Sequence, residues 1–167
     1  MIDLFNRQVV GFAMGQSMTP TLVMDALRMA WFRRRPAPGM IFHSDRGSHY
    51  ASEDYRKLIA AFRIISSMSR KGDCWDNAVT ETLFGSLKVE RLDGMRFDTR
   101  RQAKGEVMDW ITFYNHRRLH STLGYTSPMA FEQKWLAQQI SLAALTQRQE
   151  RRATGQDRYD RTANSSA

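Results

Sequence analysis

Two acidic residues and one lysine have the types and spacing that chemistry on a phosphodiester requires. Asp45 lies in the stretch H-S-D-R-G-S-H-Y, just past the apolar run M-I-F, and Glu81 and Lys88 follow further along the chain. Carboxylates can hold Mg²⁺ ions against a phosphate, and a lysine can bind the DNA backbone. The three residues are therefore candidates for metal-dependent phosphodiester chemistry.

Each of these residues also has an ordinary structural explanation. An aspartate in a turn, such as Asp45, often bonds only to its own backbone. Glu81 can complement the helix dipole near the amino end of a helix, and Lys88 can be an exposed residue on a helix face. Spacing alone leaves both explanations open.

A short strand would place Asp45 at a functional position. Residues 39–43 are apolar enough for a buried strand, and Asp45 lies just past its end. In open α/β sheets, functional residues gather just beyond the carboxyl ends of the strands. This position favours a functional role for Asp45.

One helix would position the other two residues. Asp76 or Asn77 can cap a helix that we expect to run to about Arg91. Positions 77, 81, 84 and 88 are four, three and four residues apart, so they share one face. Lys88 would lie roughly 10 Å beyond Glu81 on that face, close to two helical turns.

The rest of the chain alternates between strand and helix patterns. We expect a hairpin within residues 1–14, helices at 20–35, 52–62 and from 99, and a further strand at 63–67. Thr19-Pro20 fits a helix start, and Pro36 and Pro38 forbid its continuation. This order predicts an α/β fold in which helices pack on a mixed sheet.

The charge of the chain points to a polyanionic partner. Its 167 residues carry 25 Lys and Arg against 17 Asp and Glu, a net charge of +8. Five arginines and three acidic residues leave the last twenty residues at +2, so residues 1–147 carry +6. Nucleic acid is the commonest partner of such a basic domain.

Other features of the composition limit the class of protein. Cys74 is the single cysteine, so no internal disulfide and no C-x-x-C zinc site can form. The sequence has neither the start of a signal peptide nor a run of about 18 apolar residues, so we expect a cytoplasmic protein without a membrane span.

Three ordered motifs resemble bacterial insertion-sequence transposases of the second-reading-frame (OrfB) type, whose integrase core belongs to the retroviral-integrase-like superfamily. The resemblance covers about residues 2–135 and is carried by the stretches H-S-D-R-G-S-H-Y, S-M-S-R-K-G-D-C-W-D-N-A-V-T-E-T-L-F-G-S-L-K-V-E and Y-N-H-R-R-L-H-S-T-L-G-Y-T-S-P. It implies a ribonuclease-H-like fold and a Mg²⁺-dependent enzyme, with Mn²⁺ as a substitute, that cuts and joins DNA.

The resemblance also implies roles for the three residues. The family uses an Asp, Asp, Glu triad with thirty-five residues between the last two acids, and residues 46–80, which lie between Asp45 and Glu81, number thirty-five. Asp45 is then similar to the second acid and Glu81 to the third, both as metal ligands. Lys88 matches the basic residue seven places after the glutamate.

The sequence departs from the family at its start. The first catalytic aspartate lies on the strand before a D-L-F-S-R-like stretch, which here is residues 3–7. The resemblance therefore implies that the first strand and its aspartate are missing, that the chain is a truncated copy, and that it is inactive alone. A nuclease completed by Asp3 or Asp73 is a weaker alternative.

Further basic residues are candidates for contacts with DNA. In the loop before the Glu81 helix these are Arg70 and Lys71, and in the third motif Arg117 and Arg118, which could instead pack in the core. His116 and His120 are spaced like a pair of metal ligands, but no third ligand is evident, so we do not expect zinc. Residues 33–35, three arginines, suit either a phosphate patch or a solvated helix end.

These observations combine into one expected organisation. We expect a truncated integrase core over residues 1–98, a helical carboxyl-terminal part over 99–140 and a polar, disordered tail over 141–167. The partners would be DNA at transposon ends and target sites, in the bacterial nucleoid, and a second copy or a full-length transposase. The alternative is a remnant that binds DNA or a transposase without catalysis.

Overall fold

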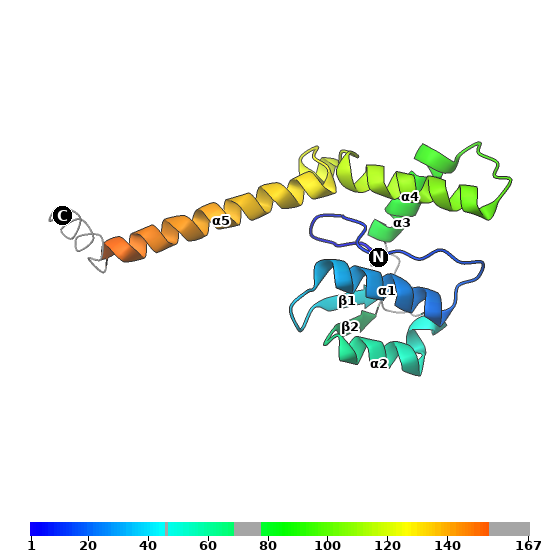
Figure 1. The fold of residues 1–167 in the computed structure, drawn as a ribbon, viewed down its shortest axis with the longest axis horizontal. Coiled ribbons are helices and arrows are strands. Elements are labelled where there is room, and N and C mark those ends of the chain that lie inside the picture. The colour runs from blue at the N-terminus through cyan, green and yellow to red at the C-terminus, as the bar shows by residue number, and fades with distance from the viewer. Residues whose placement is uncertain (46, 69–77, 154–167) are drawn as a thin grey trace, which may run out of the picture.

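Helices alternate with two short strands in the first half of the chain, and helices dominate the described part of the second half. The computed structural model describes residues 1–45, 47–68 and 78–153. Its elements are α1 (Pro20–Arg34), β1 (Ile41–Ser44), α2 (Glu53–Ala61), β2 (Ile65–Met68), α3 (Ala78–Leu87), α4 (Arg100–His116) and α5 (Pro128–Ala153) (Figure 1). Short 3-10 turns lie at Ser48–Ala51 and Ser121–Leu123, and a π-helical turn at Lys88–Leu92. The fold is mixed α/β and mostly helical.

The helices begin where the sequence provides caps. The side chain of Thr19 accepts a hydrogen bond from the Leu22 amide at 3.2 Å, and Pro20 occupies the first helical position of α1. Ser52 and Thr99 cap α2 and α4 in the same way. The expected helices over 20–35, 52–62 and from 99 are thus confirmed to within two residues.

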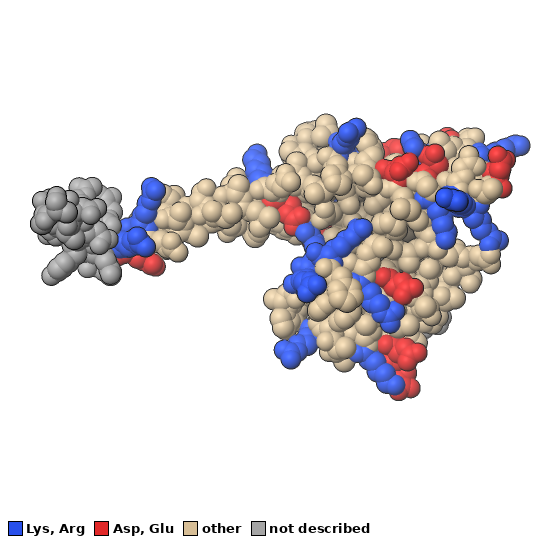
Figure 2. Space-filling model, viewed as in Figure 1, with Lys and Arg blue, Asp and Glu red and all other residues tan. Residues whose placement is uncertain are grey.

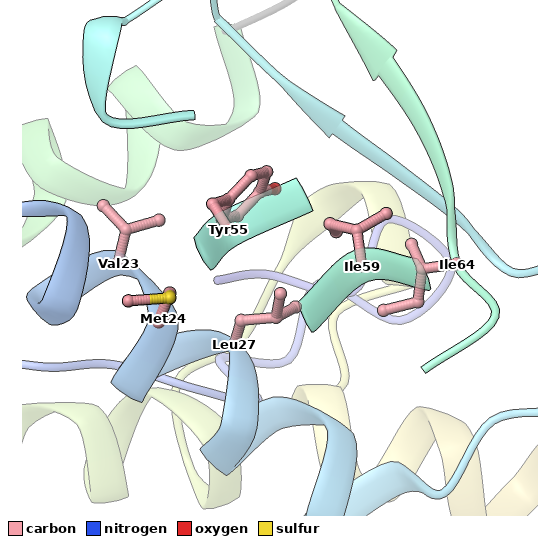
Figure 3. Packing of buried hydrophobic residues seen from close by; sticks show 6 residues of the cluster. All are labelled: Val23, Met24, Leu27, Tyr55, Ile59 and Ile64. Carbon is pink, nitrogen blue, oxygen red and sulfur yellow. The ribbon is translucent and has the colours of Figure 1, made fainter. Parts of the chain in front are cut away.

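The sheet is smaller than the mixed sheet we expected. Within the described part of the chain, it consists of β1 and β2, paired in parallel with Ile41 opposite Ile65 and Ser44 opposite Met68. Both strands lie within one or two residues of the predicted ranges. An apolar cluster packs beside them and joins α1 to α2 through Val23, Met24, Leu27, Tyr55, Ile59 and Ile64 (Figure 3).

The expected hairpin within residues 1–14 is present but short: Asp3 N–H donates to the Gln8 carbonyl at 2.8 Å and Val10 N–H to the Met1 carbonyl at 3.0 Å. A single antiparallel bridge joins Ile2 to Val9, and Arg7 takes a left-handed conformation with φ of 63° in the turn between them. The backbone N–H and C=O of Val9 take no part in the pairing with residues 1–3, and both pair with the side-chain amide of Asn115 on α4. Val10 and Gly11 still bond to Met1, and residues 12–14 carry no regular secondary structure.

A second apolar cluster holds α3 against α4. It consists of Val9, Leu87, Trp110, Ile111 and Tyr114, with Leu83 and Val107 packed at its edge. Val9 is 3% exposed and Trp110 3% exposed, so the amino-terminal segment is part of this core. Residues of the first motif thus belong to the α1–α2 unit, and the helix bearing Glu81 belongs to the α4 unit.

Arg34 joins three parts of the chain that are distant in sequence. Its guanidinium, on the last residue of α1, pairs with Asp3 at 2.7 Å and with Glu132 in the first turns of α5. All three side chains are about three-quarters buried. Arg34 is therefore a structural residue. Of the phosphate patch considered for residues 33–35, Arg35 and Arg33, whose guanidinium lies over the Phe12 ring, stay as candidates.

Helix α5 extends further than expected and projects from the body (Figure 1). We expected the helical part to end at residue 140, but α5 continues to Ala153 because residues 142–145, Leu-Ala-Ala-Leu, are strong helix formers. Its residues 133–151 are all exposed, and its middle carries no charged side chains (Figure 2). None of the helices that the structure describes is long and apolar enough to cross a membrane.

Candidate functional site

Asp45 follows β1 directly and is exposed to solvent. Its Oδ1 accepts a hydrogen bond from the backbone N–H of Gly47 at 3.0 Å, an Asx-type turn that orients the carboxylate. A Cβ added at Gly47 would lie 3.0 Å from the same oxygen, so a glycine suits this close approach. The strand end thus presents an oriented carboxylate, as its position in the sequence predicted.

Side-chain contacts near Asp45 hold the end of β1 in place. His43 Nδ1 lies 3.1 Å from Ser67 Oγ, so side chains as well as backbone join β1 to β2. Tyr50 packs edge-on against the buried Tyr55, with ring centroids 5.4 Å apart. Burial, and then the charge of Asp45, raise the pKa of Tyr50, which keeps its hydroxyl neutral beside the carboxylate.

Glu81 and Lys88 lie on α3 and at its end, and both are exposed. Glu81 is in the first turn of α3, where a carboxylate also complements the helix dipole. The helix that we expected to reach Arg91 ends at Leu87, and Lys88 begins a π-helical turn that runs to Leu92. The residues 69–77, which include Asp76, Asn77, Arg70 and Lys71, lie outside the described residues.

Two ion pairs hold the π-helical turn to α4 and the segment after it. Arg91 pairs with Glu106 on α4 at 2.6 Å, and Glu90 pairs with Arg118 at 2.6 Å. The amino-acid pattern gave no sign of these contacts, because their partners are 15 and 28 residues apart along the chain. π-helical turns occur often at functional sites, and here one begins at a candidate DNA-binding lysine.

The basic residues of the third motif differ in their surroundings. Arg117 caps the end of α4 and is exposed, which leaves its guanidinium accessible to a phosphate. Arg118 instead points to Glu90 and Ser86 and lies over the ring of Tyr114. Contact of either residue with DNA stays a prediction.

The charges around Arg118 shift the pKa values of two neighbours. The hydrogen bond from Arg118 lowers the pKa of Glu90, and Glu90 raises that of Arg118 in return. Burial, and then the charge of Arg118, lower the pKa of His120, whose ring packs edge-on against Tyr114. Folding therefore favours ionised Glu90 and neutral His120.

We expect acid to weaken the fold in part through His120. Because its folded pKa lies below the ordinary value of 6.5, the unfolded chain binds more protons, and stability falls as pH drops below about 6.5. Glu90, whose folded pKa is lowered, adds stability that is lost only as pH falls below its ordinary value of 4.5 and through its folded pKa. Urea unfolding between pH 7.5 and 5.5 should show a smaller loss of stability in His120→Gln than in the unchanged chain, whereas equal losses would contradict this account.

The described residues contain part of what a divalent metal requires. Asp45 and Glu81 are exposed carboxylates, and carboxylate oxygens are the ligands that Mg²⁺ prefers. No group of three or more potential ligands, counting histidine, cysteine, aspartate and glutamate, occurs within the described ranges. The donor type fits the metal, while Asp3, suggested as a third ligand, has its carboxylate paired with Arg34.

Comparison with known proteins identifies the integrase core. The integrase core domain family matches residues 1–74, and a second integrase core domain family matches residues 53–128. The chain is 45% identical over 134 residues to the insertion element IS600 uncharacterized 31 kDa protein of Shigella sonnei, covering 80% of this chain and 49% of that protein. It is 44% identical over 138 residues to the transposase InsF for insertion sequence IS3A of Escherichia coli, covering 82% and 48%. The chain thus spans about half the length of the curated relatives it matches.

A solved structure supports the fold. The chain resembles part of the simian T-cell lymphotropic virus intasome, determined in complex with PP2A regulatory subunit B56 gamma, with a TM-score of 0.56 and 14% identity. The match covers 68% of this chain and 40% of the matched chain. At this identity the likeness concerns the fold alone.

Proposed function

Since the chain belongs to the IS3 family of insertion-sequence transposases, which carry an integrase core, we propose that it derives from an enzyme that cuts transposon ends and joins them to target DNA. The observation that carries this proposal is the placement of Asp45 at the end of β1 and of Glu81 in the first turn of α3, two exposed carboxylates separated by thirty-five residues.

Asp45 and Glu81 would hold the divalent metal, Mg²⁺ or Mn²⁺ in its place. When bound, such an ion polarises the phosphate and stabilises the charge that develops on it. The hydrogen bond from Gly47 orients the Asp45 carboxylate before any ligand arrives. Glu81 is exposed on α3 and needs no other group removed before it can take part.

Lys88 and Arg117 would bind the DNA backbone, with Arg70, Lys71 and Arg118 as the further candidates. Each phosphate neutralised by a lysine or arginine releases counterions, so binding should weaken steeply as salt is added. The net charge of +6 on residues 1–147 supports this part of the proposal. The site of action would be the bacterial nucleoid, in a ribonuclease-H-like fold that pairs with a second copy or a full-length transposase.

The 167 residues alone would bind DNA without cutting it. Two carboxylates provide too few ligands to fix a metal with the geometry that the reaction needs. A second candidate function is a remnant that binds DNA or a transposase without catalysis, which the net charge of +6 on residues 1–147 supports.

Strand nicking and strand transfer on DNA that carries the element's ends would test the proposal, with Mg²⁺ or Mn²⁺ and beside Asp45→Asn and Glu81→Gln. We expect salt-sensitive DNA binding and no nicking, and weak Mn²⁺ binding in calorimetry that either substitution removes. Nicking that both substitutions abolish would show that another acid, such as Asp3 or Asp73, completes the site. A chain that binds neither DNA nor Mn²⁺ would refute the proposal.

A further inference from the structure

A single guanidinium bridges the junction between α3 and the π-helical turn. Arg118 Nε donates to both carboxylate oxygens of Glu90, at 3.0 and 2.9 Å, and Nη2 donates to Glu90 Oε1 at 2.6 Å. The same Nη2 donates to Ser86 Oγ at 3.2 Å. Ser86 belongs to α3 and Glu90 to the π-helical turn, so Arg118 holds the two on either side of Lys88. We propose that Arg118 is a positioning residue that fixes where Lys88 meets DNA.

The contacts of Arg118 leave it little capacity to bind a phosphate itself. Two of its three nitrogens donate to Glu90 or Ser86, and its remaining nitrogen, Nη1, lies 3.4 Å from the His120 ring. The guanidinium carbon also lies 5.7 Å from the centre of the Tyr114 ring. The side chain is 24% exposed, whereas that of Glu90 is 34% exposed. Binding a phosphate would require Arg118 to leave Glu90 without its partner.

The junction matters because it sets the direction of Lys88. A π-helical turn contains an extra residue relative to an α-helix and is rare in proteins, so we expect contacts from outside to stabilise it. Arg91, paired with Glu106, secures the far end of the turn, and Arg118 secures its start. Without Arg118 the turn is free to return to α-helical geometry, which rotates Lys88 relative to Glu81.

This inference rests on the proposed function, since it requires that Lys88 binds DNA. It also predicts that substituting Glu90 changes DNA affinity in the direction opposite to the one that simple electrostatics predicts. Removing a negative charge from a protein surface should strengthen binding to a polyanion. Glu90→Gln should instead weaken it, because the substitution releases Arg118 and with it the start of the π-helical turn.

The test measures the affinity of the full chain for a DNA duplex at several salt concentrations. The variants are Lys88→Ala, Arg118→Ala, Arg118→Lys, Glu90→Gln and the double variant of Lys88 and Arg118. Glu53→Gln is the matched control, since it removes the same charge from an exposed pair with Lys57 on α2.

We expect Lys88→Ala to weaken binding roughly tenfold near 0.1 M salt, the loss of about one phosphate contact. Arg118→Ala, Arg118→Lys and Glu90→Gln should each weaken it several-fold, while Glu53→Gln strengthens it slightly. In the Lys88→Ala background, Arg118→Ala should have no further effect. Tighter binding by Glu90→Gln, additive effects of Lys88 and Arg118, or full rescue by Arg118→Lys would overturn the inference and make Arg118 a direct DNA contact.

Hydrogen exchange separates this inference from the function on which it rests. Amides of residues 86–92 should exchange faster in Arg118→Ala and Glu90→Gln but not in Lys88→Ala. If amides exchange faster in Arg118→Ala and Glu90→Gln but Lys88→Ala binds DNA as tightly as the unchanged chain, Lys88 has no role in DNA binding. The structural role of Arg118 at the π-helical turn would then still hold. If exchange is unchanged in those two variants but Lys88→Ala binds DNA more weakly, only the structural role of Arg118 is refuted.

Discussion

Replacing Gly11 by alanine is expected to lower the free energy of unfolding by about 3 kcal/mol, the upper range for overpacking a core. An added Cβ would lie 2.2 Å from the backbone oxygen of Ala26 and 2.8 Å from both N and Cβ of Ala30. These atoms belong to the buried side of α1, so no flexible side chain can move aside. The segment after Val9 would have to separate from α1.

The same substitution elsewhere in the chain provides the control. Gly85 on α3 and Gly105 on α4 have no atom within 4 Å of an added Cβ. Because alanine favours a helix over glycine, each change should raise stability by up to about 1 kcal/mol. Urea unfolding followed by circular dichroism would compare the three variants. If Gly11→Ala proved as stable as Gly85→Ala, the close approach to α1 would be wrong.

The sequence predicted those elements whose signals are local. The caps Thr19, Ser52 and Thr99 and the breaks at the prolines set helix ends from neighbouring residues, and the structure places α1, α2 and α4 accordingly. The hairpin within residues 1–14 also had a clear local pattern, and the structure contains a short version of it, but the bond from Val9 to Asn115, 106 residues away, could not be predicted from that pattern. Local patterns name the elements but not their tertiary partners.

Some features of the candidate site were likewise predictable from the sequence, and others were not. Asp45 at a strand end and Glu81 on a helix followed from motif and spacing, and the structure places both on the surface where the sequence put them. The shortening of α3 and the π-helical turn did not follow, because they coincide with ion pairs from α4 and from Arg118 beyond it. Whether these residues act on DNA stays a prediction.

Asn115 carries the second large expected effect, because it is the only partner that the described contacts give to two buried groups of Val9. Its Oδ1 accepts from the Val9 N–H at 2.9 Å, and its Nδ2 donates to the Val9 C=O at 3.0 Å. Asn115→Ala would leave both groups buried without a hydrogen bond, at about 1–3 kcal/mol for each. We therefore expect urea unfolding to show a loss of about 2–4 kcal/mol.

A change one turn earlier on α4 controls for the loss of a hydrogen bond alone. Thr112→Val removes the bond from Thr112 Oγ1 to the Met108 carbonyl, but it does so on an exposed face, so stability should change by less than about 0.5 kcal/mol. Similar losses in Asn115→Ala and Thr112→Val would mean that the Val9 groups find other partners.

Asn115→Asp adds a test by pH. A carboxylate can accept from the Val9 N–H but faces the Val9 carbonyl with a negative charge, and burial should raise its pKa. The penalty relative to the unchanged chain is then full above that raised pKa and shrinks as pH falls through it, because the protonated acid can donate to the carbonyl again. Residues 9–11 contact both halves of the fold: Gly11 packs against α1, and Val9 bonds to Asn115 on α4. This short segment therefore connects the unit that holds Asp45 to the unit that holds Glu81. At neutral pH, Asn115→Asp should speed hydrogen exchange in both units together, and faster exchange in only one of them would contradict this connection.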